Sequence, residues 1–361
     1  MWTRAKRPAA GARATRPPAD EPEALLGLTA EYMDEGRYAD AVVVLQQLLA
    51  RRPNAVDAML ACGVCYRKLG LLDPAAHEFE RAARTNPASA AARYNLGRVY
   101  DLMGRHEDAL REHRRAIEIA PDDPEPYYRI GVTHARRDEY EESEAWYRKA
   151  IEIDPACAKA HTNLGYVLDR MGRTDEAIVE FKRAIEIDPE NAVRHLNLGA
   201  MYGERGMLRD AVAEFRKAVE IDGASGEARF NLGAALLRLG DVDDALPELE
   251  LAVKYAADSA EAHFQLGVAL SRKALFGRAV AEFQRAIVLA GERPGVSRHL
   301  GAALAALGRL EDAERCLRTA LKGDPGDHAA TYQLAVVVDR LGRSLEASDL
   351  YRRADRLKAT A

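Results

Sequence analysis

A repeat of 34 residues is the feature that most constrains the fold of this chain. The hexapeptide Ala-Ile-Glu-Ile-Asp-Pro ends at Pro155 and again at Pro189, and a near copy ends at Pro121. The tripeptide Asn-Leu-Gly recurs at the same interval or its double, beginning at Asn95, Asn163, Asn197 and Asn231. A fixed period of this length indicates a stack of similar helical units, each of which packs only against its neighbours. The sequence therefore predicts an all-α solenoid that presents a long surface.

The composition agrees with a helical array. Charged residues make up 30% of the chain and aromatic residues only 6%, and residues that favour helices dominate. The net charge of -5 argues against a nucleic-acid-binding protein, which usually needs a basic surface. No apolar run reaches the roughly 18 residues that a membrane-spanning helix needs, so we expect no membrane insertion. Four scattered cysteines are too few for a disulfide framework, which favours a reducing, cytoplasmic location.

The first 21 residues differ from the rest of the chain. They are rich in arginine and proline, carry a net positive charge and contain only Met1 and Trp2 as large apolar side chains. Such a segment cannot offset the entropy that it would lose on ordering, so residues 1–21 are predicted to be a disordered basic tail. An organelle transit peptide is the alternative interpretation, although the prolines interrupt the amphipathic helix that it requires.

Residues 22–361 divide into ten repeats of 34 residues without insertion or deletion. Repeats 1 to 10 span 22–55, 56–89, 90–123, 124–157, 158–191, 192–225, 226–259, 260–293, 294–327 and 328–361. Positions 8, 20 and 27 of the repeat are nearly always small, position 15 is usually glycine and position 32 is often proline. Small side chains let helices approach closely, glycine ends one helix in a left-handed conformation, and proline stops the next. Each repeat is expected to form helix A at about positions 2–14 and helix B at about positions 18–31.

This spaced set of residues resembles the tetratricopeptide repeat family over residues 22–361. The resemblance implies an α-solenoid of ten antiparallel helix pairs wound into a right-handed superhelix, with the A helices lining its concave face. One continuous array with a softer C-terminal third is expected rather than two domains.

Some repeats depart from the pattern. Asp138 replaces the glycine that ends helix A in repeat 4. Pro247 lies inside helix B of repeat 7, where it removes a backbone donor and is expected to shift or kink the start of that helix. Gly291, Pro294 and Gly295 make the junction of repeats 8 and 9 the expected flexible joint.

The last helix of repeat 10 is expected to show an apolar flank at the open end of the array. Its apolar residues are Leu350, Tyr351, Ala354 and Leu357. Solenoids usually cover such an end with a polar cap. Either nearby basic side chains keep this end in solution, or a partner or a second copy of the chain covers it.

A row of polar side chains is predicted at position 6 of helix A, on the concave side in the family that this chain resembles. Across repeats 3 to 10 it reads Asn95, Arg129, Asn163, Asn197, Asn231, Gln265, His299 and Gln333. A side-chain amide offers both donors and an acceptor, which suits the backbone of an extended peptide. The row resembles the asparagine ladder in the repeats of O-GlcNAc transferases, and Arg129 and His299 interrupt it. The alternative is that these amides cap or bridge neighbouring helices.

Two further positions of helix A are candidates for a peptide-binding groove. Position 13 carries Arg136, Arg170, Arg238, Arg272 and Arg340. These arginines either pair with acidic groups of a bound peptide or form ion pairs within the array. Position 5 carries aromatic side chains, notably Tyr94 and Tyr128, which either anchor a peptide or pack between successive helices. No asparagine occurs at position 9, so a carboxylate clamp of the kind that holds chaperone C-termini is not expected.

Cysteine and histidine residues give no strong sign of chemistry. Cys62 and Cys65 have the spacing of a redox or zinc motif, but they fall on the inward side of helix A and are expected to be core residues. Three histidines occupy position 4, where packing is a better account than metal binding; they are His161, His195 and His263. No phosphate-binding glycine loop, nucleophile elbow or histidine with an acid partner at a motif spacing is found.

The sequence therefore favours a non-enzymatic scaffold or adaptor that holds a protein or peptide partner, without a metal or cofactor. One alternative is a non-catalytic repeat subunit of a multi-protein enzyme, because similar arrays are fused to glycosyltransferase domains in other proteins. Any catalytic part would then be expected on a separate polypeptide. The other alternative is an architectural protein that associates end to end.

Overall fold

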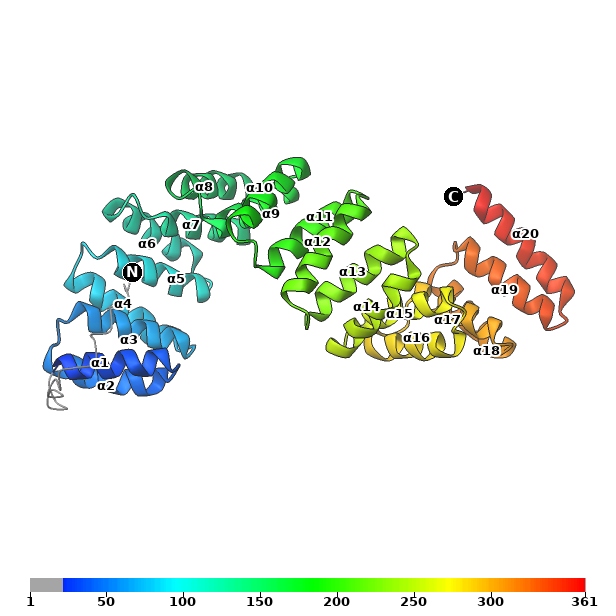
Figure 1. Cartoon of the computed structure of the whole chain (residues 1–361), viewed down its shortest axis with the longest axis horizontal. Helices are drawn as coiled ribbons and strands as arrows, with labels where there is room; N and C mark the ends of the chain where they lie inside the picture. The colour runs from blue at the N-terminus through cyan, green and yellow to red at the C-terminus, as the bar shows by residue number, and fades with distance from the viewer. Residues whose placement is uncertain (1–21, 361) are drawn as a thin grey trace. The chain divides into compact units, whose positions relative to one another are not determined.

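The computed structural model describes residues 22–360, and within them it contains twenty α-helices and no strand (Figure 1). The segment that was predicted to be a basic tail, residues 1–21, lies outside this description. The chain divides into two compact parts after Glu180, a position inside helix α10. They are called here the N-terminal half and the C-terminal half.

Each repeat contributes one helix pair, as the period predicts. The helices of repeats 1 to 5 are α1 Pro22–Asp34, α2 Tyr38–Arg51, α3 Val56–Lys68, α4 Leu72–Thr85, α5 Ala90–Leu102, α6 His106–Ile119, α7 Pro124–Arg136, α8 Tyr140–Ile153, α9 Ala158–Arg170 and α10 Thr174–Ile187. Those of repeats 6 to 10 are α11 Ala192–Glu204, α12 Leu208–Ile221, α13 Gly226–Leu239, α14 Val242–Tyr255, α15 Ala260–Arg272, α16 Phe276–Ala290, α17 Pro294–Ala306, α18 Leu310–Gly323, α19 His328–Arg340 and α20 Ser344–Thr360. All twenty helices of the described residues begin one residue earlier than predicted.

The last residue of several repeats explains where the next A helix begins. The Ser89 hydroxyl accepts a hydrogen bond from the backbone N–H of Ala92, and Ser225 and Ser259 make the same contact at α13 and α15. Such a cap satisfies one of the backbone donors that a helix leaves unpaired in its first turn.

The glycine at position 15 reverses the chain after helix A. Its backbone φ lies between +72° and +93° in the eight repeats that carry it. Asp138 takes the same left-handed conformation with φ 58°, and so does Ala274 in repeat 8 with φ 57°. An L-residue adopts this conformation at a cost in free energy, so repeats 4 and 8 store local strain.

The core lies between the two helices of each repeat, where glycine at position 8 faces the large side chain at position 24. A Cβ atom added to Gly63 would lie 2.7 Å from the ring of Phe79, and one added to Gly267 would lie 2.5 Å from the ring of Phe283. Both rings are fully buried. The small residue at position 8 is therefore required by close packing, as the sequence predicts.

Pro247 does not shift the start of α14, so that part of the prediction is wrong. The helix begins at Val242, at the same position of the repeat as the other B helices. The preceding turn is already fixed by Gly240 in the left-handed conformation and by the fully buried Ala245. Proline therefore costs one backbone hydrogen bond without moving the boundary.

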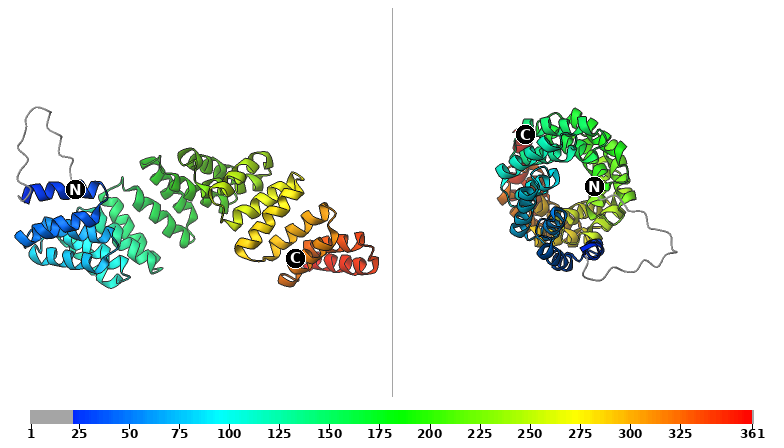
Figure 2. Two further views of the ribbon diagram at one scale, coloured as in Figure 1. Left: turned by 90° about the horizontal axis from the view of Figure 1, so that it is seen from below. Right: turned by 90° about the vertical axis from the view of Figure 1, so that its left-hand side faces the viewer.

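Successive A helices contact one another within each half, as α3 contacts α5 and α5 contacts α7. The same holds for α11, α13, α15, α17 and α19 in the C-terminal half. Figure 2 shows both halves as rows of antiparallel pairs. The side of the array formed by A helices, called here the A face, is thus the more closely packed side within each half.

Candidate functional site

A pocket of about 240 Å³ opens on the A face of the N-terminal half, between α7 and α9. It is lined by Val132, Ala135, Arg136, Tyr147, Asn163, Tyr166 and Val167. The Tyr147 side chain is 1% exposed, whereas Tyr166 is 44% exposed. Burial raises the pKa of the Tyr147 hydroxyl, which stays a neutral hydrogen-bonding group. Apolar walls with a few polar groups are typical of a ligand-binding site.

Two residues that the sequence predicts for a groove meet in this pocket. The Asn163 side chain donates from Nδ2 to the Tyr128 hydroxyl at 3.0 Å and lies 3.4 Å from the Tyr147 hydroxyl. The Arg136 side chain is exposed and makes no ion pair with any of the described residues. The pocket therefore offers a guanidinium beside an apolar wall and a positioned amide.

The other members of the position 6 row lie in different surroundings. Asn95 donates from Nδ2 to the Ala91 carbonyl oxygen of its own helix at 2.9 Å. Asn197, Asn231, Gln265 and Gln333 are half-buried. His299 packs between Phe264 and Phe283, with ring centroids 5.4 Å and 5.9 Å away, and burial lowers its pKa. The row is thus chemically uneven, and Asn163 is the member that borders a pocket.

Most arginines at position 13 bind the array itself. Arg238, Arg272 and Arg340 each donate from Nη1 to a backbone carbonyl at position 12 of the preceding repeat, at distances of 3.2 Å, 2.6 Å and 2.9 Å. The acceptors are the carbonyl oxygens of Gly203, Leu237 and Ala305. Arg170 donates from Nε to the Tyr140 hydroxyl at 3.2 Å. Arg136 is therefore the member of this set that is most available to a partner.

The aromatic residues at position 5 pack against position 24 of their own repeat. The ring centroids of Tyr128 and Tyr147 are 5.8 Å apart, and those of Tyr332 and Tyr351 are 5.5 Å apart. The Tyr94 hydroxyl donates to Glu125 at 3.0 Å. These contacts give the aromatic side chains a structural role, while Tyr332 remains 54% exposed.

Histidine at position 4 ties neighbouring repeats together. Nδ1 of His263 lies 2.6 Å from Glu282, and Nε2 lies 3.2 Å from the carbonyl oxygen of Ala257 in the preceding repeat. His161 and His195 make the equivalent contacts. Arg229 occupies the same position in repeat 7 and donates to the corresponding carboxylate and carbonyl groups. Packing, rather than metal binding, accounts for these histidines.

A buried polar cluster in repeats 3 and 4 was missed by sequence reasoning. His113 is fully buried, and its Nε2 lies 3.3 Å from Oδ2 of Asp101. The Thr133 hydroxyl donates to Oδ1 of Asp101 at 2.8 Å. Histidine at position 24, where other repeats carry phenylalanine, tyrosine or leucine, was the available signal. Because His113 has no exposed surface, this pair serves the core rather than a substrate.

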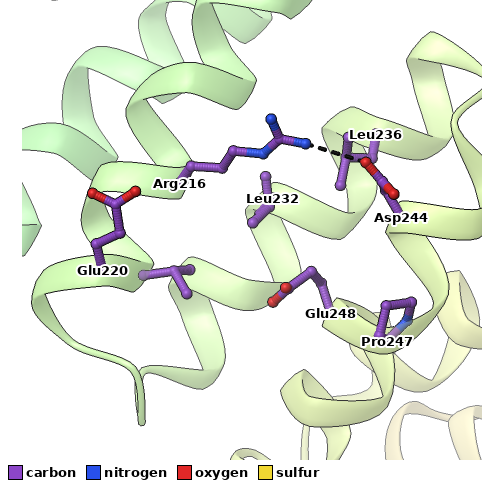
Figure 3. Close-up of a pocket in the computed structure, with 8 residues that line it drawn as sticks. Arg216, Glu220, Leu232, Leu236, Asp244, Pro247 and Glu248 are labelled. Atoms are coloured by element: carbon purple, nitrogen blue, oxygen red, sulfur yellow. Dashed lines mark hydrogen bonds and ion pairs between the residues drawn. The ribbon is translucent and has the colours of Figure 1, made fainter.

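A second pocket, of about 350 Å³, lies in the C-terminal half beside α12, α13 and α14 (Figure 3). Its lining is Arg216, Val219, Glu220, Leu232, Leu236, Asp244, Pro247 and Glu248. The charges around it are already paired, because Arg216 binds Asp244 at 3.2 Å, Lys217 binds Glu220 at 2.9 Å and Arg229 binds Glu248 at 2.6 Å. The pocket on the A face is the better candidate because Arg136 is unpaired there.

The cysteine pair is part of the core, as the sequence predicts. Cys62 and Cys65 are buried, and burial raises the pKa of their thiols to about 12 and about 11. Among residues 22–360, no group of His, Cys, Asp or Glu side chains is arranged to hold a metal ion. No helix in this part of the chain is long and apolar enough to cross a membrane.

These paired helices define the class of helical-repeat solenoids. Three models of the tetratricopeptide repeat match the chain, at residues 124–190, at 32–81 and 204–266, and at 73–124 and 300–361. Together the matched segments cover well over half of the sequence. The chain belongs to the tetratricopeptide repeat family.

Solved structures of similar fold are shorter than this chain. PilF from Pseudomonas aeruginosa matches 58% of this chain and 96% of its own, with 18% identity and a TM-score of 0.52. YrrB, a tetratricopeptide repeat protein with an unusual peptide-binding site, matches 52% and 96% with 23% identity and a TM-score of 0.44. MamA matches 45% and 94% with 27% identity and a TM-score of 0.41. PilF supports the fold alone, and no curated protein matches the chain.

Proposed function

We propose that this chain is a non-enzymatic scaffold that holds an extended peptide segment of a partner protein along the A face. The pocket between α7 and α9 carries this proposal. It combines an exposed aromatic side chain, Tyr166, with the Asn163 amide and the unpaired guanidinium of Arg136. An extended peptide needs these groups, namely a hydrophobic contact, a backbone hydrogen bond and a charge partner.

The A helices of the C-terminal half carry position 6 amides of their own. Asn197, Asn231, Gln265 and Gln333 are proposed to bind the peptide backbone, as in the ladder of O-GlcNAc transferases, while Asn95 would exchange its contact within the helix for the peptide. A cytoplasmic location is proposed with this role, because all four cysteines are free thiols.

The proposal is tested by crosslinking and affinity capture from an extract of the native host. The Tyr166→Ala and Arg136→Ala variants are expected to lose partners that the wild-type chain captures. Tyr255→Ala is a matched control, because Tyr255 is 46% exposed but lies on the B helix α14. An unchanged partner list for the Tyr166 and Arg136 variants would exclude this pocket.

The captured complex and the purified chain also distinguish two other functions. Turnover of a nucleotide sugar by the captured complex, but not by the purified chain, would identify a repeat subunit of an enzyme. A mass that grows with concentration, and that Leu357→Glu abolishes, would identify end-to-end association.

A further inference from the structure

Three arginines form a diagonal row across the A face of repeats 2 to 4. They are Arg67 at position 12 on α3, Arg98 at position 9 on α5 and Arg129 at position 6 on α7. Successive helices of this set contact each other. Arg67 and Arg98 were not among the residues that the sequence predicts, because they occupy different positions of the repeat.

The guanidinium groups are partly withdrawn from solvent and lie near one another. All three side chains are half-buried, and the Nε atoms of Arg67 and Arg129 are buried without a hydrogen-bond partner among the described residues. The Arg98 guanidinium lies 5.5 Å from the ring centroid of Tyr94, and the Arg129 guanidinium lies 5.4 Å from that of Tyr128. Burial, together with the positive charges of Arg98 and Arg129, lowers the pKa of Arg67.

Few acidic side chains offset this charge. None of the three arginines forms an ion pair with an acid in the part of the chain that the structure describes. Although burial opposes it, the Tyr94 hydroxyl and the Glu125 carboxylate raise the pKa of Arg129. Glu125 also accepts hydrogen bonds from Lys159 and from the Tyr94 hydroxyl, so it does not serve Arg129 alone. Asp101 is buried and accepts from Thr133. Arg67 and Arg98 therefore have no acid partner among the described residues, and Arg129 shares Glu125 with Lys159. The row keeps an excess of positive charge in a partly desolvated position, which an anionic partner would offset.

We infer that the row binds the carboxylates of an acidic segment within the extended peptide that the A face holds. The charges come from three successive A helices, α3, α5 and α7, so they are spread along the array rather than gathered around one small anion. A guanidinium binds a carboxylate through two parallel hydrogen bonds, and acidic side chains along an extended chain match such a row. This inference rests on the proposed function and adds the chemical class of the peptide.

The test uses the full chain and two fluorescent peptides in a polarisation assay. One peptide contains four glutamates interspersed with serine and glycine, and the other contains glutamine at the same places. The glutamate peptide is expected to bind at least tenfold more tightly, and added salt is expected to weaken its binding. Each of the variants Arg67→Gln, Arg98→Gln and Arg129→Gln should weaken it by about tenfold.

Arg285→Gln is the matched control, because it makes the same change in net charge at an exposed position on α16. It should leave the affinity unchanged. The Arg67→Gln variant should also melt no lower than the wild-type chain, because the side chain has no acid partner to lose. A lower melting temperature would point to a merely structural role.

Other outcomes overturn the inference and separate it from the proposed function. If the chain binds both peptides with equal affinity, and the Tyr166→Ala variant binds neither, the proposed peptide-binding site is supported and its preference for acidic side chains is rejected. Binding of neither peptide would overturn the acidic preference, and the capture experiment would still decide the proposed function. Binding of a phosphoserine peptide without binding of the glutamate peptide would also reject carboxylates as the ligand.

Discussion

Replacing Ala274 with glycine is expected to stabilise the chain. Ala274 follows α15, two residues after Arg272, with φ 57°, in the position where eight other repeats carry glycine at φ 72° to 93°. A Cβ atom built on those glycines meets nothing within 4 Å, so Ala274 costs backbone strain rather than a steric clash. The left-handed conformation costs an L-residue about 1–2 kcal/mol, and glycine returns about 0.4–1 kcal/mol of this by its freedom in the unfolded chain. The expected net gain is about 0.5–1 kcal/mol.

The reverse change provides the control. Gly308 has φ 77° in the next repeat, so Gly308→Ala should destabilise the same part of the array by about 0.5–1 kcal/mol. Asp138→Gly should gain less than Ala274→Gly, because it also removes the hydrogen bond that the Tyr140 hydroxyl donates to Asp138 at 2.5 Å.

Urea unfolding followed by circular dichroism measures both effects. At a denaturant slope of about 2 kcal/mol per molar, the two midpoints should move in opposite directions by roughly 0.25–0.5 M. Ala274 and Gly308 lie in neighbouring repeats, so both act on the same transition even if the array unfolds in steps. A lower midpoint for Ala274→Gly, or no change for Gly308→Ala, would refute the argument from strain.

Three further predictions follow from packing and titration. Gly267→Ala should destabilise the chain by about 1–3 kcal/mol, because the new Cβ atom would lie 2.5 Å from the Phe283 ring. Gly277→Ala is the control, because its Cβ atom would meet no atom within 4 Å and should not lower the melting temperature. Thermal melts compare the two variants. Burial, with the Arg298 charge beside it, lowers the pKa of His299 below 6.5 in the folded chain. As the pH falls, His299 is therefore protonated in the unfolded chain before it is protonated in the folded chain, and the free energy of unfolding decreases below about pH 6.5. His299→Gln should flatten melting temperatures measured between about pH 7.5 and about pH 5.5, and an unchanged slope would contradict this. The raised pKa of Cys62, about 12, should protect its thiol from iodoacetamide until the chain unfolds, which mass spectrometry of labelled peptides would detect.

The helix pairs could be predicted almost to the residue because the period fixes every close contact. Small residues at position 8 and glycine at position 15 are read directly from the sequence, and Gly63 and Gly308 behave as expected. Ala274 was not anticipated as a strained residue, although its place at position 15, where eight repeats carry glycine, was the available signal. The effect of Pro247 was overestimated because the turn before α14 already fixes its start.

The candidate site was only partly predictable. Asn163 and Arg136 were named from their positions in helix A, and the structure places both at one pocket. Tyr147 and Tyr166 come from other positions and could be joined to that pocket only in three dimensions. The same reason hid Arg67 and Arg98, because a diagonal row crosses the register in which the repeats are compared.

The arginines at position 13 have a consequence for how such a chain can change. Arg238, Arg272 and Arg340 bind main-chain carbonyl groups, and the residues that supply those groups are a glycine, a leucine and an alanine. The contact is therefore indifferent to the side chain of the neighbour. A duplicated repeat that carries such an arginine can make the same contact whatever side chain the preceding repeat has at position 12. The array can thus lengthen or exchange repeats by recombination without needing compensating substitutions at this contact.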